Sequence, residues 1–198
     1  MGSFWSWRPL DFRLKMMRIN NILRIVVSPL FCFLAIYTTR LGIDYYPLIF
    51  GLIIGIVNIK GYKFGSFIGV TLSILASYVT FFIAYFSIPL FALVLKPIFG
   101  EDRAASFVMT FSVFILAPLL VFIAYKFVLG YKNVKNINYI IITTIFLLVI
   151  IHTIHVRYYE LTQFKYEFNE SLSPYTLWQV IMALAIQLIM YQDKLKKV

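Results

Sequence analysis

The sequence predicts an all-α integral membrane protein, a polytopic bundle of six transmembrane helices in one domain. Hydrophobic residues make up 62% of the 198 residues and charged residues only 13%, whereas soluble domains are about 45–50% apolar and about 25% charged. Long stretches without any charge recur along the chain. A chain of this length cannot bury so much apolar surface in one water-facing core. The composition therefore excludes a soluble globular enzyme, and a disordered or collagen-like chain with it.

The first two expected spans, 22–39 and 43–59, are short for a bilayer, since about 20 helical residues are needed to cross it. The first is long enough if Arg24 extends its charge to the membrane surface. The second is long enough if Asp44 lies near its amino end and Pro47 lies in its first turn, where a missing N–H costs little. The alternative is that the two segments form a re-entrant hairpin, which leaves the remaining chain on the same sides.

Four further spans are expected at 66–87, 107–129, 138–156 and 174–192. The third charge-free stretch is too long for one crossing. We expect Pro89 to end or kink it, because proline removes a backbone donor and clashes with the preceding turn, and residues 88–95 to continue along the interface. Ser173 followed by Pro174 is typical of an N-cap and the first position of a helix, and marks the start of the last span.

Charge predicts the orientation of the transmembrane domain, 22–192. A basic, aromatic segment at 1–21 precedes it and a basic tail at 193–198 follows it. With the amino terminus inside, twelve of the eighteen Lys and Arg residues fall in cytoplasmic segments and five in outer ones, which agrees with the positive-inside rule. We expect an N-in/C-in protein of the bacterial cytoplasmic (inner) membrane, with both termini in the cytoplasm.

The expected partners are the lipid bilayer, with anionic lipid at its cytoplasmic face, and a second copy of the chain or another membrane protein. The cations are spread over four short segments rather than gathered in a basic domain. We therefore expect no direct contact with nucleic acid. Cys32 is the only cysteine, so no disulfide forms within the chain, and a small apolar packing role is expected for it.

Small residues recur at four-residue spacing from the second expected span into the third, which places them on one stripe of a helix. They are Gly51, Gly55, Gly61, Gly65, Gly69, Ser73 and Ser77. Small side chains let another helix come close. The row predicts either packing between these two spans within one chain, or an interface with a second copy or a partner helix.

His152 and His155 lie three residues apart near the outer end of the fifth span, and Glu160 follows them. Their spacing places both imidazoles on one helix face, and ionisable groups inside a membrane are candidates for a ligand or proton site. The alternative is a pair of histidines that form only local hydrogen bonds at the interface. Because the sequence fixes no third ligand, we expect neither a metal nor another cofactor.

Two functional hypotheses remain, since no catalytic or nucleotide-binding motif occurs and an enzyme is not expected. The first is an accessory, regulatory or effector subunit that acts through helix–helix contacts, for example in a cell-defence or immunity system, with homo-oligomers included; the small-residue row supports it. The second is a small-solute transporter or channel, supported by the histidines and by prolines inside spans. A cavity lined by Asn58, Gln179, Gln187 or His152 would favour the second hypothesis.

Overall fold

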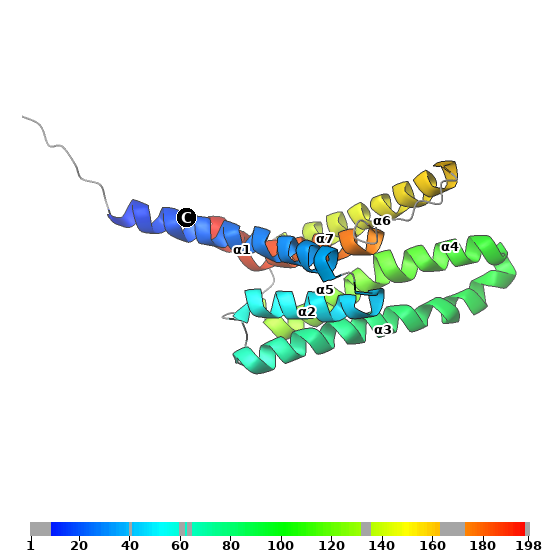
Figure 1. The fold of residues 1–198 in the computed structure, drawn as a ribbon, viewed down its shortest axis with the longest axis horizontal. Helices are drawn as coiled ribbons and strands as arrows, with labels where there is room; N and C mark the ends of the chain where they lie inside the picture. Colours follow the sequence, from blue (N-terminus) through cyan, green and yellow to red (C-terminus); the bar gives the residue numbers. More distant parts are fainter. Residues whose placement is uncertain are drawn as a thin grey trace, which may run out of the picture.

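The structure is a computed structural model that describes residues 9–39, 41–59, 62, 65–131, 136–162 and 173–196. Every element in these residues is a helix, so the all-α prediction is confirmed. The elements appear in Figure 1 and are, in order, α1 (Pro9–Thr39), the 3-10 turn η1 (Ile43–Tyr45), α2 (Tyr46–Val57), α3 (Ser66–Phe99), α4 (Glu101–Phe111), the π-helical turn η3 (Ser112–Leu116), α5 (Ala117–Leu129), α6 (Ile137–Thr162) and α7 (Pro174–Lys196).

Five helical segments are long and apolar enough to cross a membrane, and many of their apolar side chains face outward. They are Ile19–Thr39, Ser66–Phe99, Glu101–Leu129, Ile137–Arg157 and Pro174–Gln192. The second expected span is represented by a shorter apolar segment, Ile43–Val57. Its helix α2 has 12 residues and a length of about 18 Å, against about 30 Å of hydrocarbon. Five such segments in the described residues are compatible with an integral membrane protein, whereas the sequence predicts six.

Helix α3 is longer than expected, because it does not end at Pro89 but continues through Pro97 to Phe99. It ends at Gly100, which has a φ of +80° and donates its N–H to the carbonyl oxygen of Lys96 at 3.0 Å. Glycine adopts this conformation without steric cost. The chain reverses here into α4, and the Lys96 ammonium lies 2.6 Å from a Glu101 carboxylate oxygen across the turn.

The fourth expected span, 107–129, is part of a longer segment in which η3 connects α4 to α5. Pro118 explains the π turn, because it has no N–H to donate to the Phe114 carbonyl and its ring would press against that carbonyl in a regular α-helix. In η3 the N–H of Ala117 instead bonds to the carbonyl of Ser112, five residues back. The extra residue in this turn directs the buried side chains of Ser112 and Phe114 into the bundle.

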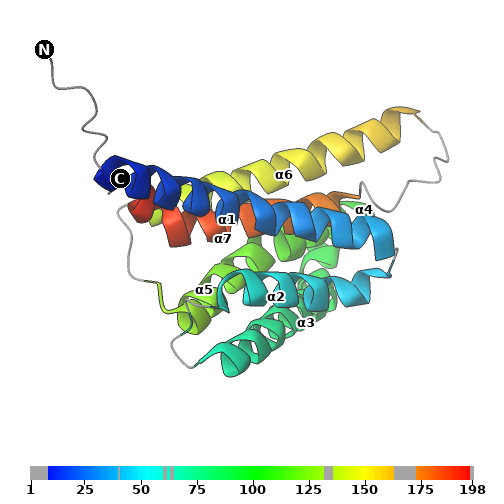
Figure 2. The ribbon, with the colours of Figure 1, turned by 60° about the vertical axis from the view of Figure 1, so that its left-hand side comes forward.

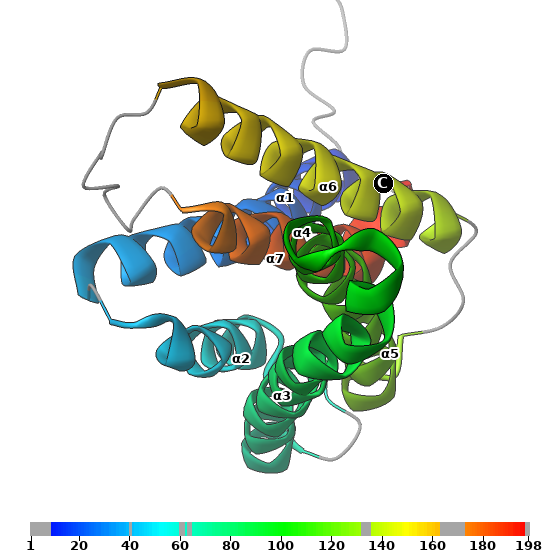
Figure 3. The same cartoon turned by 90° about the vertical axis from the view of Figure 1, so that its right-hand side faces the viewer.

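Helix α7 lies inside the bundle, in contact with α1, α2, α5 and α6 (Figure 3). Helix α1 packs along α7 and α2 packs along α3. The start of α1 and the end of α7 lie toward the same end of the bundle (Figure 2), so the two helices are antiparallel. At the opposite end, α3, α4 and α6 extend beyond the other helices (Figure 1).

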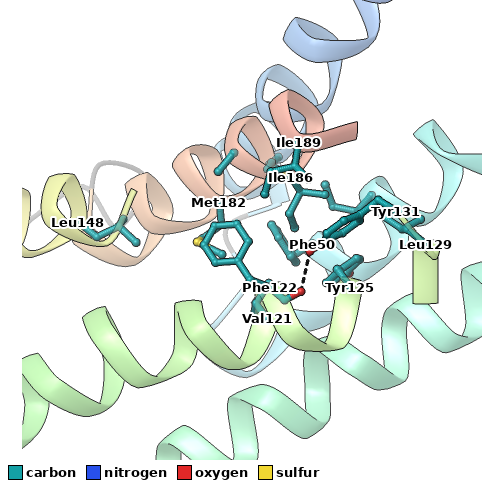
Figure 4. Packing of buried hydrophobic residues seen from close by; sticks show 14 of the residues in the cluster. Phe50, Val121, Phe122, Tyr125, Leu129, Tyr131, Leu148, Met182, Ile186 and Ile189 are labelled. Atoms are coloured by element: carbon teal, nitrogen blue, oxygen red, sulfur yellow. Dashed lines mark hydrogen bonds between the residues drawn. The ribbon is translucent and has the colours of Figure 1, made fainter. Parts of the chain in front are cut away.

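The hydrophobic core gathers around α5 and α7, as Figure 4 shows. Phe50 of α2 meets the ring of Tyr125 edge-on, with 5.8 Å between the ring centroids. Tyr131, which follows α5, folds back so that its hydroxyl donates to the carbonyl oxygen of Phe122 at 2.7 Å. The contact between Phe50 and Tyr125 joins segments that are far apart in the chain, whereas the Tyr131 bond closes the end of α5 onto itself.

Candidate functional site

A cavity of about 190 Å³ lies between α2, α3, α5 and α7, and its lining includes residues from the first turns of α2 and α7. Its wall is mainly apolar and aromatic. The apolar lining includes Phe50, Phe81, Ala84, Met109, Val113, Ala117, Val121 and Trp178. A core cavity of about 150 Å³ engineered into a soluble protein holds a benzene molecule. This cavity therefore has room for a solute with one aromatic ring.

The buried polar side chains of the cavity wall include Ser77 and Thr80 from α3 and Gln179 from α7. The Thr80 hydroxyl donates to the Ser77 carbonyl at 3.0 Å, and the Ser77 hydroxyl lies 3.0 Å from the Ser73 carbonyl. The protons of both hydroxyls thus have partners inside the protein. Gln179 is 4% exposed, and its Oε1 atom has no hydrogen-bond partner among the described residues. The Gln179 side chain therefore brings to the wall a buried acceptor atom, Oε1, that has no hydrogen-bond partner among the described residues.

The mouth of the cavity is formed by exposed residues at the start of α2 and in the middle of α3. Ile43, Asp44 and Tyr85 line the cavity and are all exposed. Asp44 adds a carboxylate at this rim, while the Gln179 side chain, which also lines the cavity, carries a buried carbonyl oxygen without a partner among the described residues. Both groups accept hydrogen bonds.

Local sequence explains how this wall is positioned. Pro47 lies in the first turn of α2, as expected, and places Asp44 just before that helix. The N-cap expected for the last span is also confirmed, because the N–H of Thr176 donates to Ser173 Oγ at 3.3 Å, which fixes the start of α7 one turn before Gln179. The turn η3 contributes Val113, and Ala117 follows it, so the π turn forms part of the cavity wall.

The row of small residues lies inside the chain, between α2 and α3. Gly51, Gly55, Gly69, Ser73 and Ser77 are all buried. A Cβ atom added to Gly51 would lie 2.6 Å from the Ile74 Cα atom, so the backbones of α2 and α3 approach each other more closely there than any larger residue permits. Of the two alternatives that the row suggests, this arrangement corresponds to packing between the two segments within one chain. An interface with another chain through these residues remains a proposal without a structural observation.

Two tyrosines complete the contacts of this row. The Tyr62 hydroxyl lies 2.7 Å from the Ser73 hydroxyl, and the hydroxyls of Ser77 and Tyr125 lie 2.9 Å apart. The Tyr125 hydroxyl also donates to the Ser73 carbonyl at 3.1 Å. Of the other two glycines in the row, Gly65 is exposed with a φ of +88°, and Gly61 lies outside the described residues.

The two histidines do not line the cavity. The His152 ring stacks on Phe114 with 4.2 Å between centroids and 18° between planes, and its Nδ1 atom is buried without a partner in the described part of the chain. His155 is half-buried on the same helix, and the side chain of Glu160 lies outside the described residues. No group of three His, Cys, Asp or Glu side chains that could hold a metal ion occurs among the described residues.

The sequence identified Gln179 as a polar residue within a span, but it could not place the residue in a cavity with Ser77 and Thr80. It also missed the aromatic side chains of Phe50 and Trp178, which form much of the wall. The one sequence feature that indicated an irregular turn at η3, and so this part of the wall, was Pro118 within the apolar stretch. Asn58 and Gln187, whose presence in a cavity would also have favoured the transporter hypothesis, are buried elsewhere, at the interfaces of α7.

Comparison with known proteins adds no relative. No protein-family model, no curated protein and no solved structure matches the chain.

Proposed function

We propose that this chain is a membrane protein that binds a small, mainly apolar solute between α2, α3, α5 and α7 and acts as a small-solute transporter. The observation that supports the proposal is the buried Gln179 side chain, which is part of the cavity lining and whose Oε1 atom has no partner in the described residues. A buried acceptor without a partner costs about 1–3 kcal/mol. A solute that donates a hydrogen bond removes this cost, so the proposed solute has an apolar body and a hydroxyl or amino group.

The proposed topology has six membrane segments, of which η1 and α2 form the shortest, and both termini in the cytoplasm. The start of α1 and the end of α7 lie at a common end of the bundle (Figure 2), and twelve of the eighteen Lys and Arg residues fall in the segments that the sequence assigns to the cytoplasm. The positive-inside rule then orients the bundle in the cytoplasmic membrane of a bacterium. In this orientation Asp44 and the mouth of the cavity belong to the outer half of the membrane.

Thermal unfolding of the purified protein in lipid nanodiscs tests the binding site, with phenol as the probe and toluene as the matched ring without a donor. We expect phenol to raise the Tm at lower concentrations than toluene does. Gln179→Met keeps the length of the side chain without the amide, so it should remove the difference between the two probes. Leu184→Met, at an outward-facing position of the same helix, serves as the control and should retain the difference.

A cavity-filling variant locates the probe. Ala117 lines the cavity and is buried, so Ala117→Leu should abolish the shift in Tm caused by phenol. A shift of wild-type size in Ala117→Leu would show that phenol binds elsewhere, and the proposed function would then be wrong.

A second candidate function, a subunit that assembles through helix contacts, is favoured by the outer end of α3. Leu90, Leu93, Val94 and Ile98 are each more than 60% exposed, on the part of α3 that projects beyond the shorter helices (Figure 1). Under this function the surface binds a second copy of the chain. Leu93→Glu should then convert a dimer in mild detergent into a monomer, as measured by mass photometry, whereas Ile123→Glu on α5 should not. A monomeric wild-type protein would exclude this candidate.

A further inference from the structure

A second set of buried polar side chains lies along α7, beyond the cavity. Gln179, Ala183, Gln187 and Tyr191 follow one another at four-residue spacing, which places them on one helix face. All four are buried. The row spans residues 179–191, with about 18 Å of helix between its first and last members, and therefore runs from the wall of the cavity to the end of the bundle where the chain begins and ends.

A matching row lies on α1 and consists of Arg24, Ser28, Cys32 and Ile36. Arg24 Nη1 donates to the hydroxyl of Tyr191 at 3.1 Å, which fixes the register of the two antiparallel helices. In two antiparallel helices this contact implies that Ser28, one turn further into the bundle, lies near the level of Gln187. The same register implies that Cys32, two turns further, lies near the level of Ala183. The residues between the two helices are thus small or polar over most of this length.

Ser28 and Gln187 are the unusual pair in this seam between α1 and α7. Both side chains are 0% exposed. Ser28 Oγ and both amide atoms of Gln187 have no hydrogen-bond partner among the described residues, so the two side chains do not bond to each other either. Buried polar groups of this kind are normally paired with protein, water or a ligand. An uncharged solute that carries a hydrogen-bond donor and an acceptor would form hydrogen bonds with both the Ser28 hydroxyl and the Gln187 amide.

A cluster of three side chains closes the seam at the end where the termini lie. The hydroxyl of Tyr191 accepts the bond from Arg24 and lies 3.5 Å from Asn58 Oδ1. The Arg24 guanidinium also lies over the Tyr191 ring, 5.8 Å from its centroid. Asn58 is held in turn by a bond from its Nδ2 atom to the Ile54 carbonyl at 2.9 Å. These contacts join α1, α2 and α7 one turn beyond Gln187.

We infer that the seam between α1 and α7 is the inner half of the solute path. Ser28 and Gln187 form a buried polar site along this path. Arg24, Tyr191 and Asn58 close the path at the end of the bundle where the termini lie, and we call these three side chains the closure. The inference rests on the proposed transport function. The two rows hold one cation, Arg24, and no acid, so the path suits an uncharged solute. The cavity receives the apolar body, and the polar group then passes from Gln179 to Gln187 along one face of α7.

Cysteine accessibility tests the closure in a Cys32→Ala background. Labelling of Gln187→Cys measures access to the buried polar site. Leu184→Cys is the outward-facing control on the same helix, and Ile59→Cys is a control at an exposed position near the closure. A membrane-impermeant maleimide is added to inverted vesicles, in which the end of the bundle with the termini faces the reagent. Tyr191→Phe and Arg24→Gln each remove the hydrogen bond between these two residues. Both variants are made so that the test still stands if one of them fails to fold.

We expect either closure variant to raise the labelling rate of Gln187→Cys about tenfold, because loss of a hydrogen bond to a charged group changes an equilibrium by roughly that factor. Labelling of Leu184→Cys and Ile59→Cys should not change. Unaltered labelling of Gln187→Cys in both variants would overturn the inference. If phenol still raises the Tm in that case, the cavity binds solute without this path. If Gln187→Cys responds but phenol binds nowhere, the path stands and the proposed cavity site fails.

Discussion

The indole nitrogen of Trp178 on α7 donates a hydrogen bond to the carbonyl oxygen of Val113 in η3, at 3.0 Å. This carbonyl has no donor within its own helix. The N–H of Ala117, four residues on, already bonds to Ser112, and Pro118, five residues on, has no N–H. The π turn therefore leaves one acceptor without a partner, and a side chain from the neighbouring helix supplies the donor.

This relationship predicts the effect of Trp178→Phe, which keeps an aromatic ring but removes the donor. The variant should lower the free energy of unfolding by about 1–3 kcal/mol, the usual cost of a buried acceptor left without its partner. Pro118→Ala restores an N–H that can reach the Val113 carbonyl. Trp178→Phe should therefore cost less in a Pro118→Ala background. Denaturant unfolding of the four proteins in a double-mutant cycle measures the coupling, and strictly additive losses would contradict it.

The close approach of α2 and α3 predicts a strong effect of a single methyl group at Gly51. Gly51→Ala would place a Cβ atom 2.6 Å from the Ile74 Cα atom, and the contact is with backbone, so it cannot be relieved by a rotamer change. We expect a loss of about 1–3 kcal/mol in unfolding free energy, as in other overpacked cores. Gly42→Ala is the matched control, because a Cβ atom added there would meet nothing within 4 Å and the φ of −62° suits any residue. Equal stability of the two variants would refute the close contact.

Local features of the sequence predicted much of the fold. Prolines and serines at helix starts act through their own backbone groups, so the positions of Pro47 and Ser173 were recognisable without tertiary structure. Charge-free stretches likewise located the apolar helices. The continuation of α3 through Pro89 was not predictable, because a membrane helix tolerates one missing N–H when neighbouring groups compensate, and those neighbours are set by tertiary packing.

The candidate site was less predictable because it depends on contacts between residues far apart in the chain. Asp44, Thr80, Ala117 and Gln179 come from four different helical segments or their ends, and only the packed bundle brings them to one cavity. Gln179 and Gln187 look equivalent in the sequence, since both are glutamines inside one apolar span. The difference between a cavity wall and a sealed seam arises from which helix each side chain faces.

Tyr131 gives a prediction at alkaline pH, because it follows the span that ends at Leu129. Burial raises the pKa of the Tyr131 phenol above its ordinary value near 10, and the neutral hydroxyl donates to the Phe122 carbonyl. In the unfolded chain the same phenol ionises near pH 10. The folded state therefore holds one more proton above that pH, and its stability should fall as the pH rises through this range.

The variant Tyr131→Phe removes this proton linkage. Its free energy of unfolding should be lower than that of the wild type at pH 8, where the hydroxyl bond is intact. Between pH 9.5 and about 11 the wild type should lose stability more steeply than Tyr131→Phe, so the two curves converge. Denaturant unfolding across this range measures the two slopes, and Tyr139→Phe, at a largely exposed position, should follow the wild type. Parallel curves would mean that the Tyr131 hydroxyl ionises as easily in the folded protein as in the unfolded chain.

Two substitutions of His152 distinguish a packing role of this residue from a role in binding a ligand or a proton. Its ring stacks on Phe114, while its buried Nδ1 atom has no partner among the described side chains. His152→Phe keeps the stacked pair and removes the unpaired nitrogen, so the unfolding free energy should be unchanged or higher. His152→Ala loses the stacked ring and should cost about 2 kcal/mol or more, through the lost contact and the space left behind. A solute or proton role in phenol binding requires the imidazole itself, so a His152→Phe protein that is stable but no longer responds to phenol would show that the histidine does more than pack.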